Sequence, residues 1–242
     1  MKKGTFTVTS NEALAPGVWR MALAGDTSAI TGPGQFVDLA LPGRFLRRPI
    51  SVCDWTEGEV VLVYKVVGQG TAQMSQMGAG TRLDVLTGLG NGYDLDRSGD
   101  RPLLVGGGVG IPPLYALAKR LLAQGKRPTA VLGFNTAAEI FLADAFRALG
   151  IETVVTTVDG SAGVRGFVTD GMPEGGTYVY TCGPEPMLRA VYEKSRTSGQ
   201  FSFEERMGCG FGACMGCTCR TKYGNKRICR EGPVLEKEEI IW

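Results

Sequence analysis

The chain has 242 residues, which is enough for two domains that each bury a core. Its 26 basic and 24 acidic residues leave a net charge of about +2 without a basic stripe, so we expect no nucleic-acid partner. No apolar run approaches the ~18 residues of a membrane span, and no apolar stretch follows the two early lysines. We therefore expect a cytoplasmic protein with neither signal peptide nor membrane contact.

Histidine is absent from the chain. This excludes a Ser-His-Asp triad, a Cys-His pair, a histidine-based zinc protease and a Rieske cluster. Hydride and single-electron chemistry stay possible, because a bound cofactor carries them.

Residues 1–98 predict a small antiparallel β-barrel. They contain six short segments rich in β-branched or alternating apolar residues, with turn residues between them. A helix-like piece, 70–77, interrupts the series. The expected strands are 4–10, 17–24, 34–41, 48–55, 59–67 and 81–88.

Residues 99–200 alternate between strands and helices, with "SGDRP" at 98–102 as the linker. This alternation predicts a doubly wound parallel sheet. A strand, a glycine turn and a helix are expected within 101–125, further strands at 129–134, 152–158 and 177–183, and helices at 137–150 and 184–195. Residues 201–242 hold five of the seven cysteines. This segment is too short to form a stable core without a cross-link or a bound metal.

Two strand-to-helix boundaries of the second domain are candidate nucleotide sites. In "VGGGVGIPP" the glycines let the backbone approach a phosphate at a helix N-terminus, although Ile111 replaces the last glycine of GxGxxG. A turn without a ligand therefore stays an alternative. The glycines are Gly106, Gly107, Gly108 and Gly110. The second boundary, at the same sheet edge, consists of Cys182, Gly183 and Pro184.

Two segments of the barrel are candidate anion sites. In "RRPIS" the guanidinium of Arg48 suits a phosphate, and Ser51 adds a hydroxyl. Gly70 and Thr71 precede a short helix, where backbone N–H groups can meet an anion. A solvated arginine and an ordinary turn remain the alternative for each segment.

The cysteines have the spacing C-x4-C-x2-C…C, which is the plant-type [2Fe–2S] ligand pattern. Amide groups of the glycine-containing loop "CGFGAC" can point toward the cluster sulfides. The main competitor is a zinc site, but zinc sites usually show paired CxxC motifs and only one is present. The predicted ligands are Cys209, Cys214, Cys217 and Cys229.

Cys219 is an alternative third ligand. It also follows Cys214 after four residues, but Lys222 stands where that shifted pattern needs its next cysteine. Spacing therefore favours Cys217 without excluding Cys219.

Several motifs together resemble the ferredoxin–NADP reductase superfamily. "RPIS" is similar to its flavin motif, "GGGVGIPP" to its pyridine-nucleotide loop and "CGPEPM" to its C-G-P-x-x-M motif. "LRRPISV", "TGLGNGY", "RMGCGFGACMGCTC" and "CREGPV" narrow the resemblance. Over essentially its whole length the chain resembles the electron-transfer subunits of NAD-dependent dihydroorotate dehydrogenase.

This resemblance implies a pyrimidine-pathway oxidoreductase subunit with FAD, a [2Fe–2S] cluster and NAD. An FMN-containing catalytic subunit would oxidise dihydroorotate, and electrons would pass through the cluster and FAD to NAD+. The implied assembly is a heterotetramer of two plus two subunits. The implied FAD residues are Arg48, Pro49, Ile50, Ser51, Tyr64, Lys65, Val66, Gly70 and Thr71.

Some features depart from the superfamily or leave alternatives. Val109 stands where many reductases carry threonine, and "GFNTAAEIF" lacks arginines for a 2′-phosphate, which favours NAD over NADP. The terminal Trp242 either stacks on the flavin or packs elsewhere. Alternative functions are a diaphorase subunit of a bifurcating transhydrogenase, sulfide dehydrogenase or hydrogenase, a self-standing oxygenase reductase, and a zinc-stapled scaffold.

Overall fold

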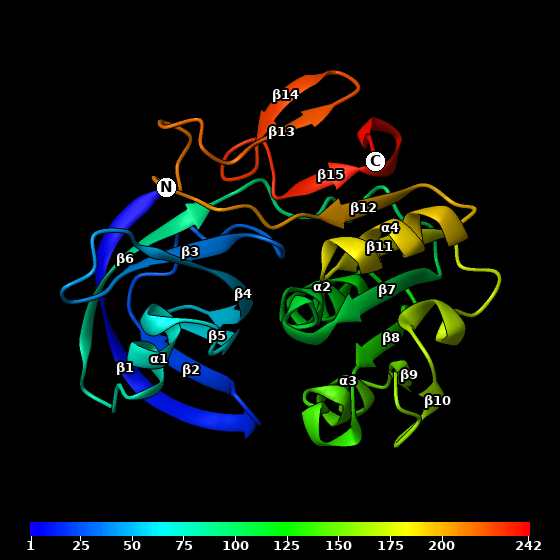
Figure 1. The fold of residues 1–242 in the computed structure, drawn as a ribbon, viewed down its shortest axis with the longest axis horizontal. Coiled ribbons are helices and arrows are strands. Elements are labelled where there is room, and N and C mark those ends of the chain that lie inside the picture. Colours follow the sequence, from blue (N-terminus) through cyan, green and yellow to red (C-terminus); the bar gives the residue numbers. More distant parts are fainter.

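The structure, a computed structural model, describes residues 1–242. Two lobes lie side by side, and the C-terminal segment runs across both of them (Figure 1). The first lobe is a closed antiparallel barrel, as predicted, and its strands follow the order β1-β2-β5-β4-β3-β6. Its elements are β1 (Lys2–Ala15), β2 (Val18–Ala24), β3 (Phe36–Ala40), β4 (Arg48–Thr56), β5 (Glu59–Lys65), α1 (Gln69–Ser75) and β6 (Arg82–Leu89).

Alternation along the strands separates the inside of the barrel from its outside. Val37 and Leu39 of β3 point into the barrel core, where they meet alternate residues of β5. Phe36, on the outer face of β3, packs instead with residues of the C-terminal segment. The outer face of β3 is therefore a contact surface for that segment.

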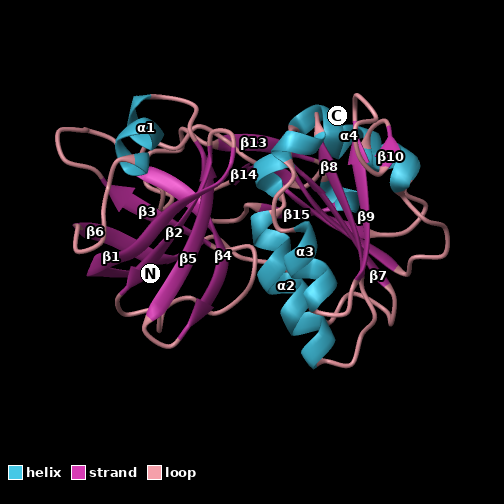
Figure 2. Ribbon diagram, turned by 90° about the horizontal axis from the view of Figure 1, so that it is seen from below, coloured by secondary structure: helices cyan, strands magenta, loops and turns pink.

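The second lobe is a seven-stranded sheet of order β10-β9-β8-β7-β11-β12-β15, parallel except for β15. Helices α2 and α3 pack on one face and α4 on the other, which confirms the doubly wound arrangement (Figure 2). Its elements up to residue 194 are β7 (Pro102–Gly107), η1 (Gly108–Gly110), α2 (Pro112–Ala123), β8 (Thr129–Phe134), η2 (Ala137–Glu139), α3 (Ala143–Ala148), β9 (Glu152–Thr157), β10 (Val164–Arg165), η3 (Val168–Gly171), β11 (Tyr178–Cys182) and α4 (Glu185–Lys194).

The predicted continuous helix over 137–150 is wrong. The segment forms only η2 and the short α3, and Leu142 between them has a left-handed φ of 61°. The break lets Phe141 bury its ring edge-on against Phe134, with centroids 5.5 Å apart. Tertiary packing therefore overrides the local helical propensity.

The C-terminal segment is not a separate layer. β12 (Gly199–Ser202) joins β11, and β15 (Val234–Glu236) pairs antiparallel with β12. Between them lie the hairpin strands β13 (Thr218–Thr221) and β14 (Gly224–Arg227), and η4 (Lys237–Glu239) follows β15. None of these strands was predicted, and β12 spans the position at which we expected the third segment to begin.

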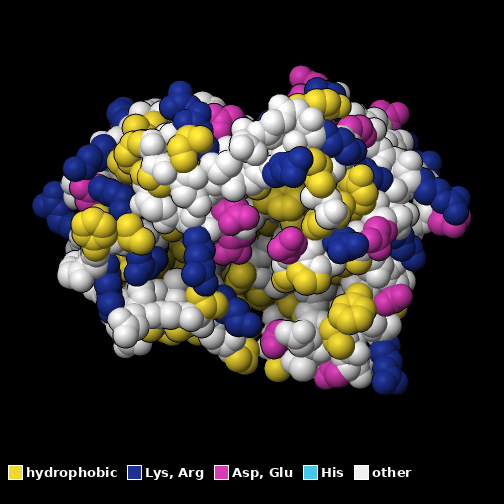
Figure 3. All heavy atoms as spheres, turned by 45° about the horizontal axis from the view of Figure 1, so that its top comes forward, with side chains coloured by type: hydrophobic (Ala, Val, Ile, Leu, Met, Phe, Trp, Pro, Cys, Tyr) yellow, Lys and Arg dark blue, Asp and Glu magenta, His cyan; other side chains and the backbone are white.

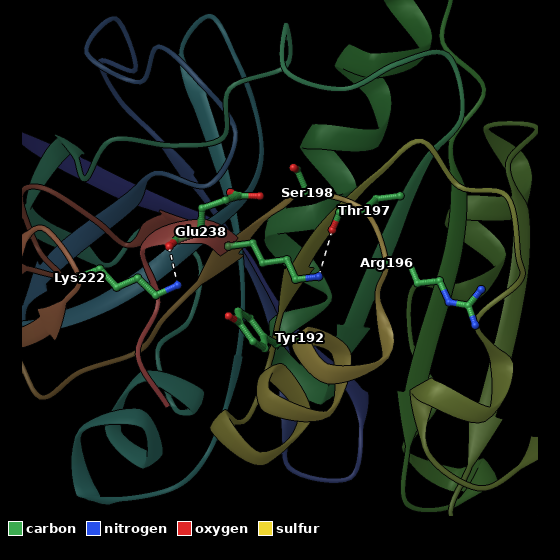
Figure 4. A pocket seen from close by; sticks show the side chains of 7 residues that line it. Tyr192, Arg196, Thr197, Ser198, Lys222 and Glu238 are labelled. Carbon is green, nitrogen blue, oxygen red and sulfur yellow. Dashed lines mark hydrogen bonds between the residues drawn. The ribbon is translucent and has the colours of Figure 1, made fainter.

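A polar hollow marks the joint between α4 and this segment (Figure 4). Lys237 donates to the carbonyl oxygen of Thr197 (3.1 Å), and Lys222 donates to that of Glu238 (2.8 Å). Nearby, Trp242 packs against Tyr192 and Phe203 at centroid distances of 5.8 Å. The end of the chain is therefore packed on the second lobe.

Side chains of β4 and α2 brace the two lobes against each other. Lys119 of α2 forms an ion pair with Asp54 (2.6 Å), and the guanidinium of Arg120 lies 3.9 Å from the ring centroid of Trp55. The strand that carries the "RPIS" motif is thereby fixed against the second lobe. No helix combines the length and apolar character that crossing a bilayer requires.

Candidate functional site

The cysteine segment brings four of its thiols into two contacting pairs. The N–H of Cys214 donates to the sulfur of Cys209 (3.4 Å), and the N–H of Cys229 donates to the sulfur of Cys217 (3.4 Å). The structure thus places all four predicted ligands in one region.

Cys219 lies outside both pairs. It stands in β13 opposite Lys226, and the acidic groups near it are Glu205 and Glu239. Burial raises the pKa of its thiol, and the Glu205 carboxylate adds to this effect. Its surroundings therefore favour Cys217 over Cys219 as a metal ligand.

Backbone N–H groups surround the sulfur of Cys209. Ala213 donates to it over 3.2 Å, in addition to Cys214. Burial acts to raise the pKa of this thiol, but the N–H donors of Cys214, Phe211 and Ala213 outweigh it and lower the pKa to about 6. The loop therefore favours the thiolate, which is the form that binds metal.

The loop "CGFGAC" fits closely between the barrel and the residues after Cys229. Gly210 has a φ of 76°, and a Cβ there would lie 2.3 Å from Oδ2 of Asp38. Gly212 has a φ of 91°, and its Cβ would lie 2.6 Å from the side chain of Arg230. Both positions require glycine, because other residues are strained at these angles and would clash.

The donor set fits a [2Fe–2S] cluster better than a zinc ion. Such a cluster takes two thiolates on each of two irons, and the thiols form two pairs. A zinc ion would instead need all four thiolates around one point.

Arg227 holds the cysteine loop from the opposite side. Its guanidinium donates to the carbonyl oxygen of Gly212 (2.6 Å) and to the carboxylate of Glu231 (2.9 Å). Sequence reasoning missed this residue, because an arginine near a cysteine gives no signal of what it contacts.

Asn91 joins two motifs that the sequence analysis singled out separately. Its amide donates to the carbonyl oxygens of Glu231 (3.1 Å) and Val234 (2.7 Å), and its Oδ1 accepts the N–H of Val234 (3.1 Å). "TGLGNGY" therefore fastens "CREGPV" to the barrel. Both motifs are visible in the sequence, but their contact is not.

Burial also affects Asp38, which sequence reasoning did not single out. Its side chain is only 2% exposed on the outer face of β3. Desolvation raises the pKa of its carboxyl to about 6, although the guanidinium of Arg47 opposes the shift. The sequence signal was a charged residue inside an apolar strand.

The predicted flavin motif lies at the start of β4. Arg48 donates to the carbonyl oxygen of Leu46 (2.7 Å), and a Cβ on Gly70 would lie only 2.1 Å from its guanidinium. Gly70 therefore allows α1 to approach Arg48. Pro49 and Ser51 pair with Asp38 and Phe36 of β3, so they share the outer face of the barrel, while Ile50 packs toward the barrel core.

The other predicted flavin residues are placed differently from one another. Tyr64 lies in the barrel core, where its hydroxyl donates a hydrogen bond to Oδ1 of Asn11 (3.1 Å). Lys65 is exposed, and Val66 is half-buried. The hydroxyl of Thr71 accepts the N–H of Val67 (3.0 Å), so it closes the start of α1. Of the three predicted residues Tyr64, Lys65 and Val66, only the last two have side chains outside the barrel core.

The two predicted nucleotide turns lie side by side at the C-terminal ends of β7 and β11. A Cβ on Gly107 would meet the sulfur of Met187 at 2.5 Å, and one on Gly110 would meet the Cys182 carbonyl oxygen at 2.3 Å. A Cβ on Gly183, next to Pro184, would also clash with the side chain of Met187, and one on Gly106 would clash with Leu114 of α2. Only Gly108, with a φ of 52°, adjoins open space, so most of these glycines serve to pack the turns together.

Acidic groups follow β8 and β9, where a dinucleotide's ribose would be bound in such a sheet. Glu139 accepts a hydrogen bond from the amide of Asn135 (2.9 Å), and Asp159 accepts one from Ser161 (2.6 Å). Carboxylates here would repel a 2′-phosphate, which agrees with the expected preference for NAD.

The molecular surface is hollowed between the two lobes (Figure 3). Hydrophobic side chains lie within the hollow, and charged side chains surround it. A hollow between a barrel and a doubly wound sheet suits a bound cofactor.

Comparison with known proteins identifies the family. Residues 204–241 match the family described as the iron-sulfur cluster binding domain of dihydroorotate dehydrogenase B, and residues 104–193 match the oxidoreductase NAD-binding domain. The chain is 41% identical to the dihydroorotate dehydrogenase B (NAD(+)) electron transfer subunit of Geobacillus sp. (strain WCH70), covering 100% of this chain and 99% of that protein. The chain belongs to this family. The subunit of Bacillus pumilus is also 41% identical, covering 99% of this chain and 98% of that protein.

Solved structures extend the comparison. A chain of the NADH-dependent reduced ferredoxin–NADP oxidoreductase, studied for flavin-based electron bifurcation, is 32% identical with a TM-score of 0.90, covering 98% of this chain and 90% of that chain. A ferredoxin NADP+ reductase from Neisseria gonorrhoeae with bound FAD and NADP is 15% identical with a TM-score of 0.71. The match covers 80% of this chain and 90% of that chain. The second match concerns the fold alone.

Proposed function

We propose that this chain accepts electrons from a partner that oxidises dihydroorotate and delivers them, through a [2Fe–2S] cluster and FAD, to NAD+ in pyrimidine biosynthesis. Its membership in the electron transfer subunit family supports this function. The observation that carries it is the contact between the cysteine loop and β3, whose neighbour β4 bears the flavin motif. One-electron and two-electron sites would therefore adjoin in a single chain.

When bound, the cluster exchanges single electrons, FAD exchanges one or two, and NAD+ accepts a hydride. The residues of the chain hold these groups and adjust their surroundings. The N–H donors around Cys209 would stabilise its thiolate, and Arg227 would keep the loop in place. The proposed cluster ligands are Cys209, Cys214, Cys217 and Cys229.

The FAD is proposed to bind on the barrel beside the second lobe. Arg48 would meet its phosphates with Gly70 nearby, and Pro49 and Ser51 would line the outer face of β4. NAD is proposed to bind at the paired turns of the second lobe, where Gly108 adjoins open space.

Co-expression with a dihydroorotate-oxidising partner tests the function. The complex should be brown-yellow and should reduce NAD+ when it is given dihydroorotate. The chain alone should still pass electrons from NADH to an artificial acceptor. A complex that oxidises dihydroorotate without reducing NAD+ would contradict the proposed function, and a colourless preparation containing zinc would contradict the cofactors.

The proposed partner is an FMN-containing catalytic subunit, in a heterotetramer of two copies of each chain. The curated relatives are named as electron transfer subunits, which implies a separate catalytic subunit. Native mass spectrometry of the purified complex would measure the stoichiometry, and a mass for one copy of each chain would exclude the tetramer. The cytoplasmic location stays a prediction from the sequence.

The diaphorase alternative has weaker support. The relative studied for electron bifurcation is 32% identical, whereas the dihydroorotate dehydrogenase B relatives reach 41% over the full length. Efficient NADH–NADP transhydrogenation together with no response to dihydroorotate would favour this alternative.

A further inference from the structure

Asp38 occupies the outer face of the barrel between the two proposed redox sites. It lies in β3 between Val37 and Leu39, which point into the barrel core, so its own side chain points outward. Its register partner in β4 is Pro49 of the proposed flavin motif. The carboxyl group therefore shares a face with that motif.

The cysteine loop covers this carboxyl group. A Cβ on Gly210 would lie 2.3 Å from Oδ2 of Asp38, so the glycine backbone rests directly against the carboxyl oxygen. Gly210 follows the proposed ligand Cys209 in the chain. Asp38 thus contacts the segment that would hold the cluster.

The other oxygen of the carboxyl group has no partner. Oδ1 of Asp38 is buried without a hydrogen bond. The neighbouring Arg47 donates instead to the carbonyl oxygen of Asp38 (3.2 Å) and to the carboxylate of Asp84 (2.8 Å). A buried carboxyl group without a partner destabilises the folded chain.

Nothing in the packing of the barrel requires a carboxyl group here. The other outward residues nearby, Phe36 and Leu86, are apolar and pack against the C-terminal segment. An apolar residue at position 38 would avoid the desolvation cost. A destabilising group at the contact between the flavin motif and the cysteine loop indicates a role in function.

We propose that Asp38 sets the reduction potential of the [2Fe–2S] cluster relative to FAD. The inference rests on the proposed function, since it requires the cluster and the flavin to be present. A negative charge beside the cluster disfavours addition of an electron, and burial leaves that charge poorly screened. Cluster potentials respond to net charge and hydrogen bonding in this way. Asp38 therefore holds the cluster potential down.

The test is the midpoint potential of the cluster in the cofactor-loaded full chain, followed by electron paramagnetic resonance during a redox titration at pH 8. Asp38→Asn keeps the size of the side chain and removes its charge. We expect the equilibrium constant for one-electron reduction to rise at least tenfold, which is about 59 mV. The matched control, Asp26→Asn, removes an exposed barrel charge paired with Lys2 and should leave the potential unchanged.

A second variant, Asp38→Ala, allows the potential to be measured if Asp38→Asn does not retain the cluster. A raised potential in either loaded variant supports the inference. An unchanged potential in a loaded variant overturns it, as does loss of the cluster from both variants, which would show a purely structural role. A wild-type chain without flavin and cluster absorption would instead refute the proposed function.

Discussion

Single residues decide the chemistry of the cysteine segment. Cys217 and Cys219 lie two positions apart, yet the first contacts Cys229 and the second stands beside Lys226 and acidic side chains. A ligand must bring its sulfur to the other thiols, so local surroundings separate two residues that spacing alone could not separate.

We predict that Cys217→Ser removes the cluster and that Cys219→Ser retains it. The reason is that only Cys217 belongs to a thiol pair. Iron and labile sulfide per chain, together with the visible spectrum, measure the result. Equal iron content in the two variants would show that the assignment of the third ligand is wrong.

Gly210→Ala should destabilise the cysteine loop more than a comparable change elsewhere. Its φ of 76° strains any other residue, and the added Cβ would clash with Asp38. Together these effects should cost about 2–3 kcal/mol in the free energy of unfolding.

The control for this prediction is Gly43→Ala. Gly43 has a similar φ of 71° but open space around its Cβ position, so only the backbone strain of about 1 kcal/mol remains. Urea unfolding followed by circular dichroism compares the two variants. Equal losses of unfolding free energy in the two variants would mean that the cysteine loop shifts to accommodate the added methyl group.

At the scale of secondary-structure elements, the C-terminal segment depends on others for its stability. β15 completes the sheet of the second lobe, the cysteine loop rests on β3, and Asn91 fastens the turn between them. A segment this short cannot bury enough apolar surface by itself. Its fold is therefore fixed by the two lobes that it crosses.

Asn91→Ala should release this segment from the barrel. It removes three hydrogen bonds and leaves partly buried backbone groups without partners, which should cost about 1–3 kcal/mol. Limited proteolysis should then cut within 203–234 faster than in the wild type. Asn225→Ala, in an exposed hairpin position, is the control, and equal cleavage of both variants would contradict the role of Asn91.

At the scale of the whole molecule, the arrangement of the lobes controls how the proposed flavin and nucleotide sites face each other. The contact between β4 and α2 places the flavin motif beside the lobe that carries the nucleotide turns. Hydride transfer requires the reacting atoms to come within about 3–3.5 Å, so small rotations between the lobes would affect it.

Arg120→Ala should loosen this brace. Loss of the stacking on Trp55 should lower the free energy of unfolding by about 0.5–2 kcal/mol and slow the reduction of FAD by NADH. Stopped-flow absorbance of the flavin measures the rate. Arg127→Ala, which removes an exposed arginine after α2, should leave both quantities unchanged, and an unaltered rate in the Arg120 variant would argue against coupling between the brace and hydride transfer.

The sequence by itself determined what local patterns encode. Alternating residues gave the six barrel strands, the glycine turns marked the two boundaries that lie together, and cysteine spacing indicated a four-thiol site. Only the tertiary structure decided contacts between distant residues, such as the packing of the cysteine loop against Asp38 and the hydrogen bonds between Asn91 and Val234. It also decided the helix break at Leu142. The physical reason is that such contacts depend on how separate elements pack, which no local periodicity records.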